Sequence, residues 1–134
     1  MTTNVRPLIA IIDDDVSICR ALSRLVRSLE MDAETFPSGQ AFFQKLESLQ
    51  SFHPDCVVLD IQMPGKNGLV VQGEIRRCRS RLPVIFITAH DEVGLRERAL
   101  AAGAMAYLCK PFNDTAFAET LRAALEQRAG RERA

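Results

Sequence analysis

Five strand-length runs, most of them apolar throughout, alternate with segments of helical periodicity, and this alternation restricts the fold more than any other feature. Runs that are apolar at successive positions are typical of strands buried on both faces of a sheet. The runs cover residues 8–12, 33–36, 56–59, 83–87 and 105–109. The pattern predicts an α/β fold, with a parallel sheet and helices on both of its faces.

The segments between the runs have apolar residues at steps of three and four, as in amphipathic helices. Helices are expected around residues 18–29, 42–49, 69–79 and 95–102 and in a last segment that carries Phe117 and Leu121. Capping residues support these boundaries: Asp15, Ser38 and either Asn113 or Asp114 before helices, and Gly103 after one. Strand and helix thus alternate five times within one chain.

Composition excludes several classes of protein. The 134 residues suit one domain, and 47% apolar with 25% charged residues indicates a globular chain. The 17 basic and 17 acidic residues give a formal net charge of zero, so bulk electrostatic capture of nucleic acid is not expected. The arginines between residues 76 and 81 are interpreted as a solvated helix face.

The four cysteines lack the spacing of a zinc site and are interpreted as reduced thiols. The N-terminal residues have no apolar signal core, and no apolar run approaches the length of a membrane span. The sequence therefore predicts a soluble protein of the cytoplasm that has no membrane partner.

Polar side chains follow four of the five expected strands. Asp13 and Asp14 follow the first, Asp60 the third, Thr88 the fourth and Lys110 the fifth. Because the carboxyl ends of parallel strands meet at one edge of the sheet, these groups are expected to share one pocket. After Asp60 the chain turns at the signal Met63-Pro64-Gly65.

Three carboxylates in one pocket raise each other's pKa, and a hard divalent cation such as Mg²⁺ relieves this repulsion. Lys110 and Thr88 could then hold the oxygens of a phosphoryl group, one by charge and one by hydrogen bond. One of the carboxylates would be the nucleophile and form an acyl phosphate. The residue types and their positions therefore predict phosphoryl chemistry at this edge.

Four segments, each at a strand end, carry a resemblance to a known family. They read 11-IIDDD-15, 59-LDIQMPGKNG-68, 84-VIFITAH-90 and 107-YLCKPF-112. The chain resembles a CheY-like receiver domain of a two-component response regulator. The sequences around its motifs are most similar to those of FixJ/NarL-type regulators. The resemblance covers nearly the whole sequence, roughly residues 7–128. The receiver domain is expected to span residues 1–128, and 129–134 are expected to start a linker or C-terminal tail. It implies a doubly wound (βα)5 sandwich with a five-stranded parallel sheet of order 2-1-3-4-5.

The resemblance also implies roles for individual residues. Asp60 would be the phosphoacceptor. The Mg²⁺ ion would be bound by Asp13, Asp14, Asp60 and the backbone carbonyl of Gln62. The phosphoryl group would be bound by Thr88 and Lys110, beside the small residue Ala89. Thr88 and Tyr107 would form the conformational switch, and the Lys110–Pro111 peptide bond would be cis.

The same resemblance implies a signalling phosphoacceptor rather than an enzyme. A sensor histidine kinase would donate the phosphoryl group, and a phosphorylation-dependent homodimer would follow. Output would be transcriptional, with DNA bound only through a C-terminal domain that these 134 residues do not contain. The alternative is a stand-alone receiver that acts through protein contacts.

Two other classes of protein share part of this sequence pattern. Asp13-x-Asp15-x-Ser17 resembles the nucleophile loop of haloacid-dehalogenase-type phosphatases, in which Asp13 would be the nucleophile and Asp15 the acid. That interpretation leaves Asp60 without a role. A pseudo-receiver that serves only as an adaptor is disfavoured, because every residue needed for phosphorylation is present.

Overall fold

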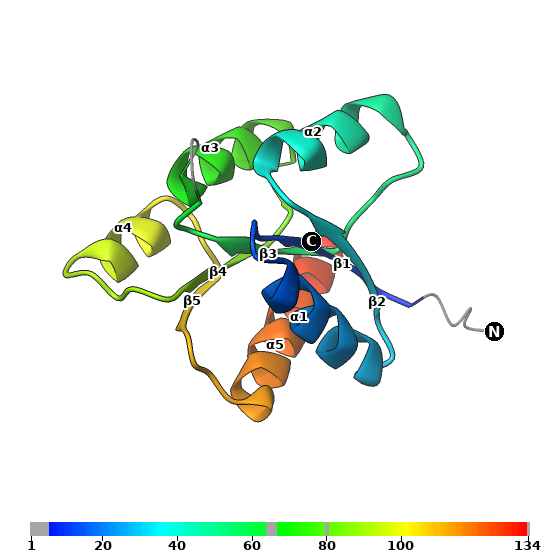
Figure 1. The fold of residues 1–134 in the computed structure, drawn as a ribbon. Coiled ribbons are helices and arrows are strands. Elements are labelled where there is room, and N and C mark those ends of the chain that lie inside the picture. The colour runs from blue at the N-terminus through cyan, green and yellow to red at the C-terminus, as the bar shows by residue number, and fades with distance from the viewer. Residues whose placement is uncertain (1–5, 64–66, 80, 134) are drawn as a thin grey trace.

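The computed structural model of the chain describes residues 6–63, 67–79 and 81–133, and side chains as far as residue 127. Strand and helix alternate as expected (Figure 1). The strands are β1 (Leu8–Ile12), β2 (Asp32–Phe36), β3 (Cys56–Asp60), β4 (Val84–Thr88) and β5 (Ala106–Cys109). The helices are α1 (Val16–Ser28), α2 (Gly39–Ser48), α3 (Gly68–Cys78), α4 (Leu95–Ala101) and α5 (Asp114–Arg133). The turn signal at Pro64 and Gly65 lies outside the described residues.

The five strands form one parallel sheet of order β2-β1-β3-β4-β5, which confirms the expected topology. Asp60 pairs with Ile87, and Thr88 pairs with Cys109. The carboxyl ends of the three strands β3, β4 and β5 are therefore in register. The polar residues at or just after these ends all reach the same edge of the sheet.

Helices cover both faces of the sheet and bury a core on each (Figure 1). Successive residues of β1 point to opposite faces. Ile9 and Ile11 pack with α1 and α5, whereas Ala10 and Ile12 pack with α2, α3 and α4. All four residues are fully buried, which explains why this strand has no polar position in the sequence.

Side-chain caps fix the starts of the helices near the polar edge. The Asp15 carboxylate accepts from the Ser17 N–H at 2.9 Å, and the Ser38 hydroxyl accepts from Ala41 at 3.1 Å. The Asn113 side chain accepts from the Ala116 N–H at 2.7 Å, so Asn113 rather than Asp114 caps α5. Asn67 caps α3 by accepting from Val70 at 3.1 Å, a cap that the sequence pattern did not single out.

Two further observations concern the cysteines and the length and hydropathy of the helices. Cys19 and Cys56 are buried, and all four cysteines are free thiols. In the described part of the chain, no helix has the length and apolar character needed to cross a membrane. Helix α5 continues through Arg133, so the backbone at 129–133, where a linker was expected to begin, is helical.

Candidate functional site

Three carboxylates meet at the carboxyl edge of the sheet. One carboxylate oxygen from each of Asp13, Asp14 and Asp60 lies within 4.8 Å of the other two. Asp13 is 1% exposed and Asp60 is 6% exposed, whereas Asp14 faces solvent. The site is thus an acidic pocket with a buried floor and one exposed side, and its oxygen atoms are of the kind that hard divalent cations bind.

The backbone after β3 is shaped closely around Asp60. The Gln62 N–H donates to the Asp60 carboxylate at 3.0 Å, and the Gly68 N–H donates to the Ile61 carbonyl at 2.8 Å. A Cβ atom at Gly68 would lie 2.6 Å from the Ile61 Cα and 2.9 Å from the Asp60 carbonyl oxygen. Gly68 is therefore required so that α3 can start directly against the strand that carries Asp60.

Lys110 brings a positive charge to the acidic pocket. Its ammonium group donates to the Asp13 carboxylate at 3.2 Å, across 97 residues of sequence. Its backbone N–H donates to the Thr88 carbonyl at 2.7 Å, which fixes the start of the loop after β5. The peptide bond between Lys110 and Pro111 is cis, as the resemblance implied.

Thr88 is fully buried and connects the pocket to the loop after β4. Its hydroxyl lies 3.1 Å from Gln62 Oε1 and 3.1 Å from the carbonyl oxygen of His90, and it accepts from the His90 N–H at 3.1 Å. A hydroxyl has a single proton to donate, so Thr88 can satisfy only one of these two acceptors at a time. Its hydrogen bonding can therefore change without unfolding the strand end.

Burial raises the pKa of Asp60 to about 6. The negative charges of Asp13 and Asp14 raise it as well, while the Gln62 N–H and Lys110 lower it. A carboxylate with such a pKa carries a poorly compensated negative charge at neutral pH. The pocket is electrostatically suited to bind a cation beside Asp60.

The raised pKa predicts that metal-free stability depends on pH. Since the folded chain holds a proton on Asp60 that the unfolded chain releases, the free energy of unfolding should fall between about pH 4 and pH 6 and change little above. Because one pKa unit corresponds to about 1.4 kcal/mol, charging Asp60 should lower the free energy of unfolding by at most about 3 kcal/mol at neutral pH. Urea unfolding in EDTA across this range measures it. Asp60→Asn should flatten that part of the profile, and an unchanged slope in Asp60→Asn would contradict the assignment.

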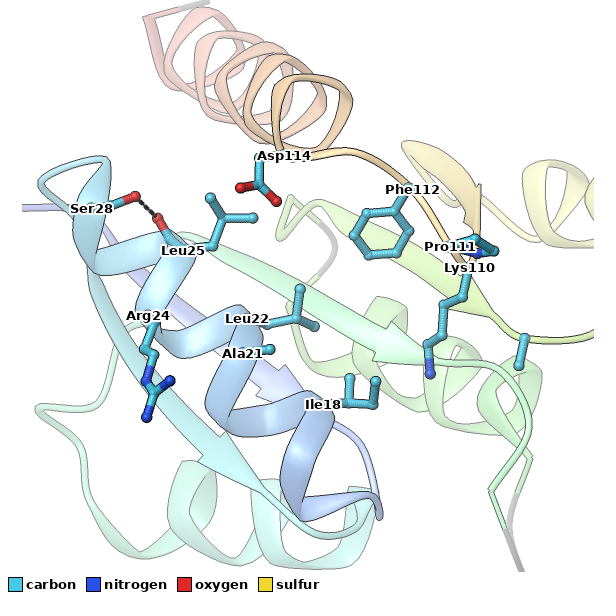
Figure 2. Close-up of a pocket in the computed structure, with 11 residues that line it drawn as sticks. Ile18, Ala21, Leu22, Arg24, Leu25, Ser28, Lys110, Pro111, Phe112 and Asp114 are labelled. Atoms are coloured by element: carbon cyan, nitrogen blue, oxygen red, sulfur yellow. Dashed lines mark hydrogen bonds between the residues drawn. The ribbon is translucent and has the colours of Figure 1, made fainter.

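An apolar groove of ≈ 880 Å³ opens beside the pocket, between α1 and the loop after β5 (Figure 2). In Figure 2, the side chains of Ile18 and Leu22 on α1 face Lys110 and Phe112 across the groove. Ala89, one of the residues expected beside the phosphoryl group, lines the same groove. The groove therefore begins at the side chain that contacts Asp13 and extends along α1.

Tyr107, the expected switch residue, is 4% exposed and packs on the α2, α3 and α4 side of the sheet. Its hydroxyl donates to the Asp91 carboxylate at 3.1 Å, and the Arg96 guanidinium lies 5.8 Å from the ring centroid. Asp91 and Arg96 were not singled out from the sequence. Nothing in the periodicity marks a loop or surface residue as the partner of a distant tyrosine.

The chain belongs to the response regulator receiver domain family, whose family model matches residues 9–122. With the sheet order and the acidic edge described above, this makes it a receiver domain of the two-component response regulator type. The alternative as a haloacid-dehalogenase-type phosphatase loses its main support, because the Asp15 carboxylate caps α1.

Among relatives, the chain is 35% identical over 127 residues to nodulation protein W of Bradyrhizobium diazoefficiens, covering 92% of this chain and 53% of that protein. It is 35% identical over 119 residues to the response regulator protein TodT of Pseudomonas putida, covering 89% of this chain and 51% of TodT. The chain thus spans about half the length of these relatives.

Solved structures agree with this assignment. A response regulator receiver protein from Burkholderia phymatum is 51% identical, with a TM-score of 0.83 over 90% of this chain and 96% of that one. The response regulator StyR is 33% identical, with a TM-score of 0.81 over 96% of this chain and 64% of that one.

Proposed function

We propose that this chain takes a phosphoryl group from a sensor histidine kinase onto Asp60, with Mg²⁺ bound, and that the resulting change of conformation controls transcription. The observation that carries the proposal is the cluster of Asp13, Asp14 and Asp60 with Lys110 donating into it. This set combines a nucleophile, ligands for a metal and a cation for phosphoryl oxygens. Such a set performs phosphoryl transfer mainly by positioning and charge neutralisation.

The donor set fits Mg²⁺. Three carboxylates within 4.8 Å supply hard oxygen ligands, and the exposed side at Asp14 leaves room for the waters that Mg²⁺ retains. Asp13, Asp14, Asp60 and the backbone carbonyl of Gln62 would hold the ion. When bound, the ion would offset the charge of the pocket and of the incoming phosphoryl oxygens.

In the proposed reaction, an Asp60 carboxylate oxygen attacks the phosphorus of a phosphohistidine. The new O–P bond forms as the P–N bond breaks, and the imidazole leaves with the bonding electron pair. Lys110, which contacts Asp13 in the free chain, is near enough to the pocket to bind a phosphoryl oxygen. The Thr88 hydroxyl can turn from Gln62 or His90 to another oxygen.

The proposed partners follow from the same edge of the sheet. The apolar groove between α1 and the loop after β5 opens at Lys110, so a kinase domain seated there could present a histidine to Asp60. Transcriptional output would require a further DNA-binding domain and fits a phosphorylation-dependent homodimer. Supporting this output, a relative that is 38% identical over 108 residues is the DNA-binding transcriptional regulator NtrC of Escherichia coli.

The chain would act in the cytoplasm. It would be a signalling phosphoacceptor, which is phosphorylated once per cycle, rather than an enzyme that turns over a substrate. Its four free thiols support a reducing compartment. Residues 1–128 would form the receiver, and residues 129–134 would start a linker or a C-terminal tail.

Intact mass spectrometry tests the proposal directly. After incubation with Mg²⁺ and a small acyl phosphate, the wild-type chain should gain the mass of one phosphoryl group, and EDTA should prevent the gain. A chain that gains no mass under saturating donor, while its fold is intact by circular dichroism, would overturn the proposal.

A further inference from the structure

A second cavity, of ≈ 360 Å³, lies at the edge of the sheet opposite the acidic pocket. Its lining residues come from α3, from the segments that lead into β4 and β5, and from α5: Gln72, Arg76, Leu82, Pro83, Gly103, Ala104, Met105 and Gln127. The segments before β4 and β5 meet where these parallel strands begin, whereas Asp60 is the last residue of β3. The cavity therefore shares no residue with the site of the proposed phosphoryl transfer.

Gln72 is the buried polar residue of this cavity. It is 1% exposed, and in the described part of the chain its Oε1 is the only buried side-chain nitrogen or oxygen atom without a hydrogen-bond partner. Its side-chain nitrogen donates to the Ala102 carbonyl at 3.4 Å. Turning the amide over would place Oε1 against that carbonyl oxygen, so the amide has one favourable orientation. Since a buried acceptor without a donor costs free energy, a ligand that donates to Oε1 would recover it.

Arg76 supplies the charge of the cavity. It is the only charged residue among the described residues that line the cavity, and it is exposed. Its Nη1 donates at 3.1 Å to the Ala102 carbonyl, the same oxygen that accepts from Gln72. A Cβ atom at Gly103 would overlap with this guanidinium. The glycine therefore leaves the space in which the cation lies beside the buried amide.

These groups define the chemistry of a ligand. A guanidinium favours a carboxylate, which it can bind through two parallel hydrogen bonds. The free acceptor on Gln72 requires a donor, and a hydroxyl suits it better than an ammonium group, which Arg76 would repel. Leu82 and Met105 add apolar surface to the lining, which favours an organic anion over an inorganic one.

We propose that this cavity binds a small α-hydroxycarboxylate. The carboxylate binds Arg76, the hydroxyl donates to Gln72 Oε1, and a short apolar chain packs against Leu82. Because Oε1 is covered in the free chain, a neighbouring side chain has to shift before the hydroxyl reaches it. Arg76 is the side chain that an anion draws outward, and the Ala102 carbonyl then keeps its hydrogen bond from Gln72. The volume of the cavity is at the lower end of the range for small-molecule sites.

An NMR titration with α-hydroxyisovalerate tests the proposal on the metal-free, unphosphorylated chain. Proton–nitrogen correlation spectra of the isotope-labelled chain are recorded at constant pH and ionic strength as the probe is added. The signals of Gly103, Met105 and the Gln72 side-chain amide should shift together, with a Kd in the millimolar range that suits so small a ligand. The backbone amide of Gln62, which donates to Asp60, is the reference and should not shift.

Two related probes separate the hydroxyl from the charge without changing the protein. Isovalerate lacks the hydroxyl and should bind about tenfold more weakly, because Gln72 Oε1 then remains without a donor. The amide α-hydroxyisovaleramide lacks the charge and should also bind about tenfold more weakly or worse, because its contact with Arg76 is no longer an ion pair.

Three variants assign the two contacts to residues. Gln72→Leu removes the free acceptor and should bind α-hydroxyisovalerate and isovalerate with equal affinity. Arg76→Gln removes the charge and should weaken binding of both acids by about tenfold. Arg77→Gln is the matched control, because Arg77 is the adjacent exposed arginine of α3 and does not line the cavity. It should bind as the wild type does.

Equal affinities of the wild type for the two acids would overturn the proposal, as would wild-type affinity in Arg76→Gln. The absence of shifts around the cavity at the solubility limit of the probe would also overturn it. The same spectra show whether each variant is folded. If Gln72→Leu does not fold, the comparison of the two acids on the wild type still decides. Because the titration needs neither Mg²⁺ nor a phosphoryl donor, its outcome is independent of the proposed function.

Discussion

Asp60→Asn should abolish the Mg²⁺-dependent gain of a phosphoryl group. Because no phosphoryl group can then be accepted at position 60, this substitution should have the largest effect on phosphorylation. The amide keeps the shape of the side chain and can still accept from the Gln62 N–H, which lies 3.0 Å from the carboxylate. It lacks the charged oxygen that attacks phosphorus. Intact mass after treatment with Mg²⁺ and an acyl phosphate measures the loss.

Two further aspartates serve as controls for that result. Asp13→Asn should slow the gain strongly, because Asp13 is a proposed metal ligand and the partner of Lys110. Asp15→Asn should phosphorylate normally, because Asp15 caps α1 and asparagine caps helices about as well. A full gain in Asp60→Asn with complete loss in Asp13→Asn would instead favour Asp13 as the nucleophile, as in the phosphatase alternative.

Phe42→Ala should lower the free energy of unfolding by about 3 to 5 kcal/mol, as expected for removal of a fully buried aromatic side chain. Phe42 is 0% exposed, and its ring centroid lies 5.5 Å from that of Phe36 and 6.0 Å from that of Phe52. This cluster joins α2 to β2 and to the segment before β3. Urea unfolding followed by far-ultraviolet circular dichroism measures the change, since the chain has no tryptophan.

Phe43→Ala is the matched control in the same helix. The Phe43 ring lies 5.4 Å from the Phe42 ring, but Phe43 is only partly buried. Its removal leaves a smaller cavity, so it should cost less than half as much. Equal losses at the two positions would contradict the assignment of Phe42 as the centre of this core.

Much of the fold and of the site could be predicted from local patterns. The runs at 8–12 and 56–59 identified central strands, because only strands covered on both faces can be apolar at successive positions. Asp15 and Ser38 were recognisable caps because their side chains bond to backbone two or three residues away. The boundaries were less certain: β3 extends to Asp60, and α3 begins at Gly68 rather than Leu69.

The acidic pocket was predictable for a different reason. Parallel strands place their carboxyl ends at one edge, so the residues after each strand are neighbours whatever the loops do. That rule placed Asp13, Asp14 and Asp60 together, and the structure agrees. It could not give the burial of Asp13 and Asp60 or the pKa of about 6 for Asp60, because these depend on how α3 and the loops close over the edge.

The sequence alone thus established the order of the elements, the fold class and the identity of the acidic groups. The spacing of apolar residues and the positions of the strand ends are local properties of the chain, so they can be read without the tertiary structure. Only the tertiary structure decided that Lys110 contacts Asp13, that Thr88 meets Gln62, and that Asp91 holds Tyr107. These pairs are separated by 16 to 97 residues. Which of several available donors and acceptors meet at such separations is set by loop paths and side-chain rotamers, and no sequence period encodes either one.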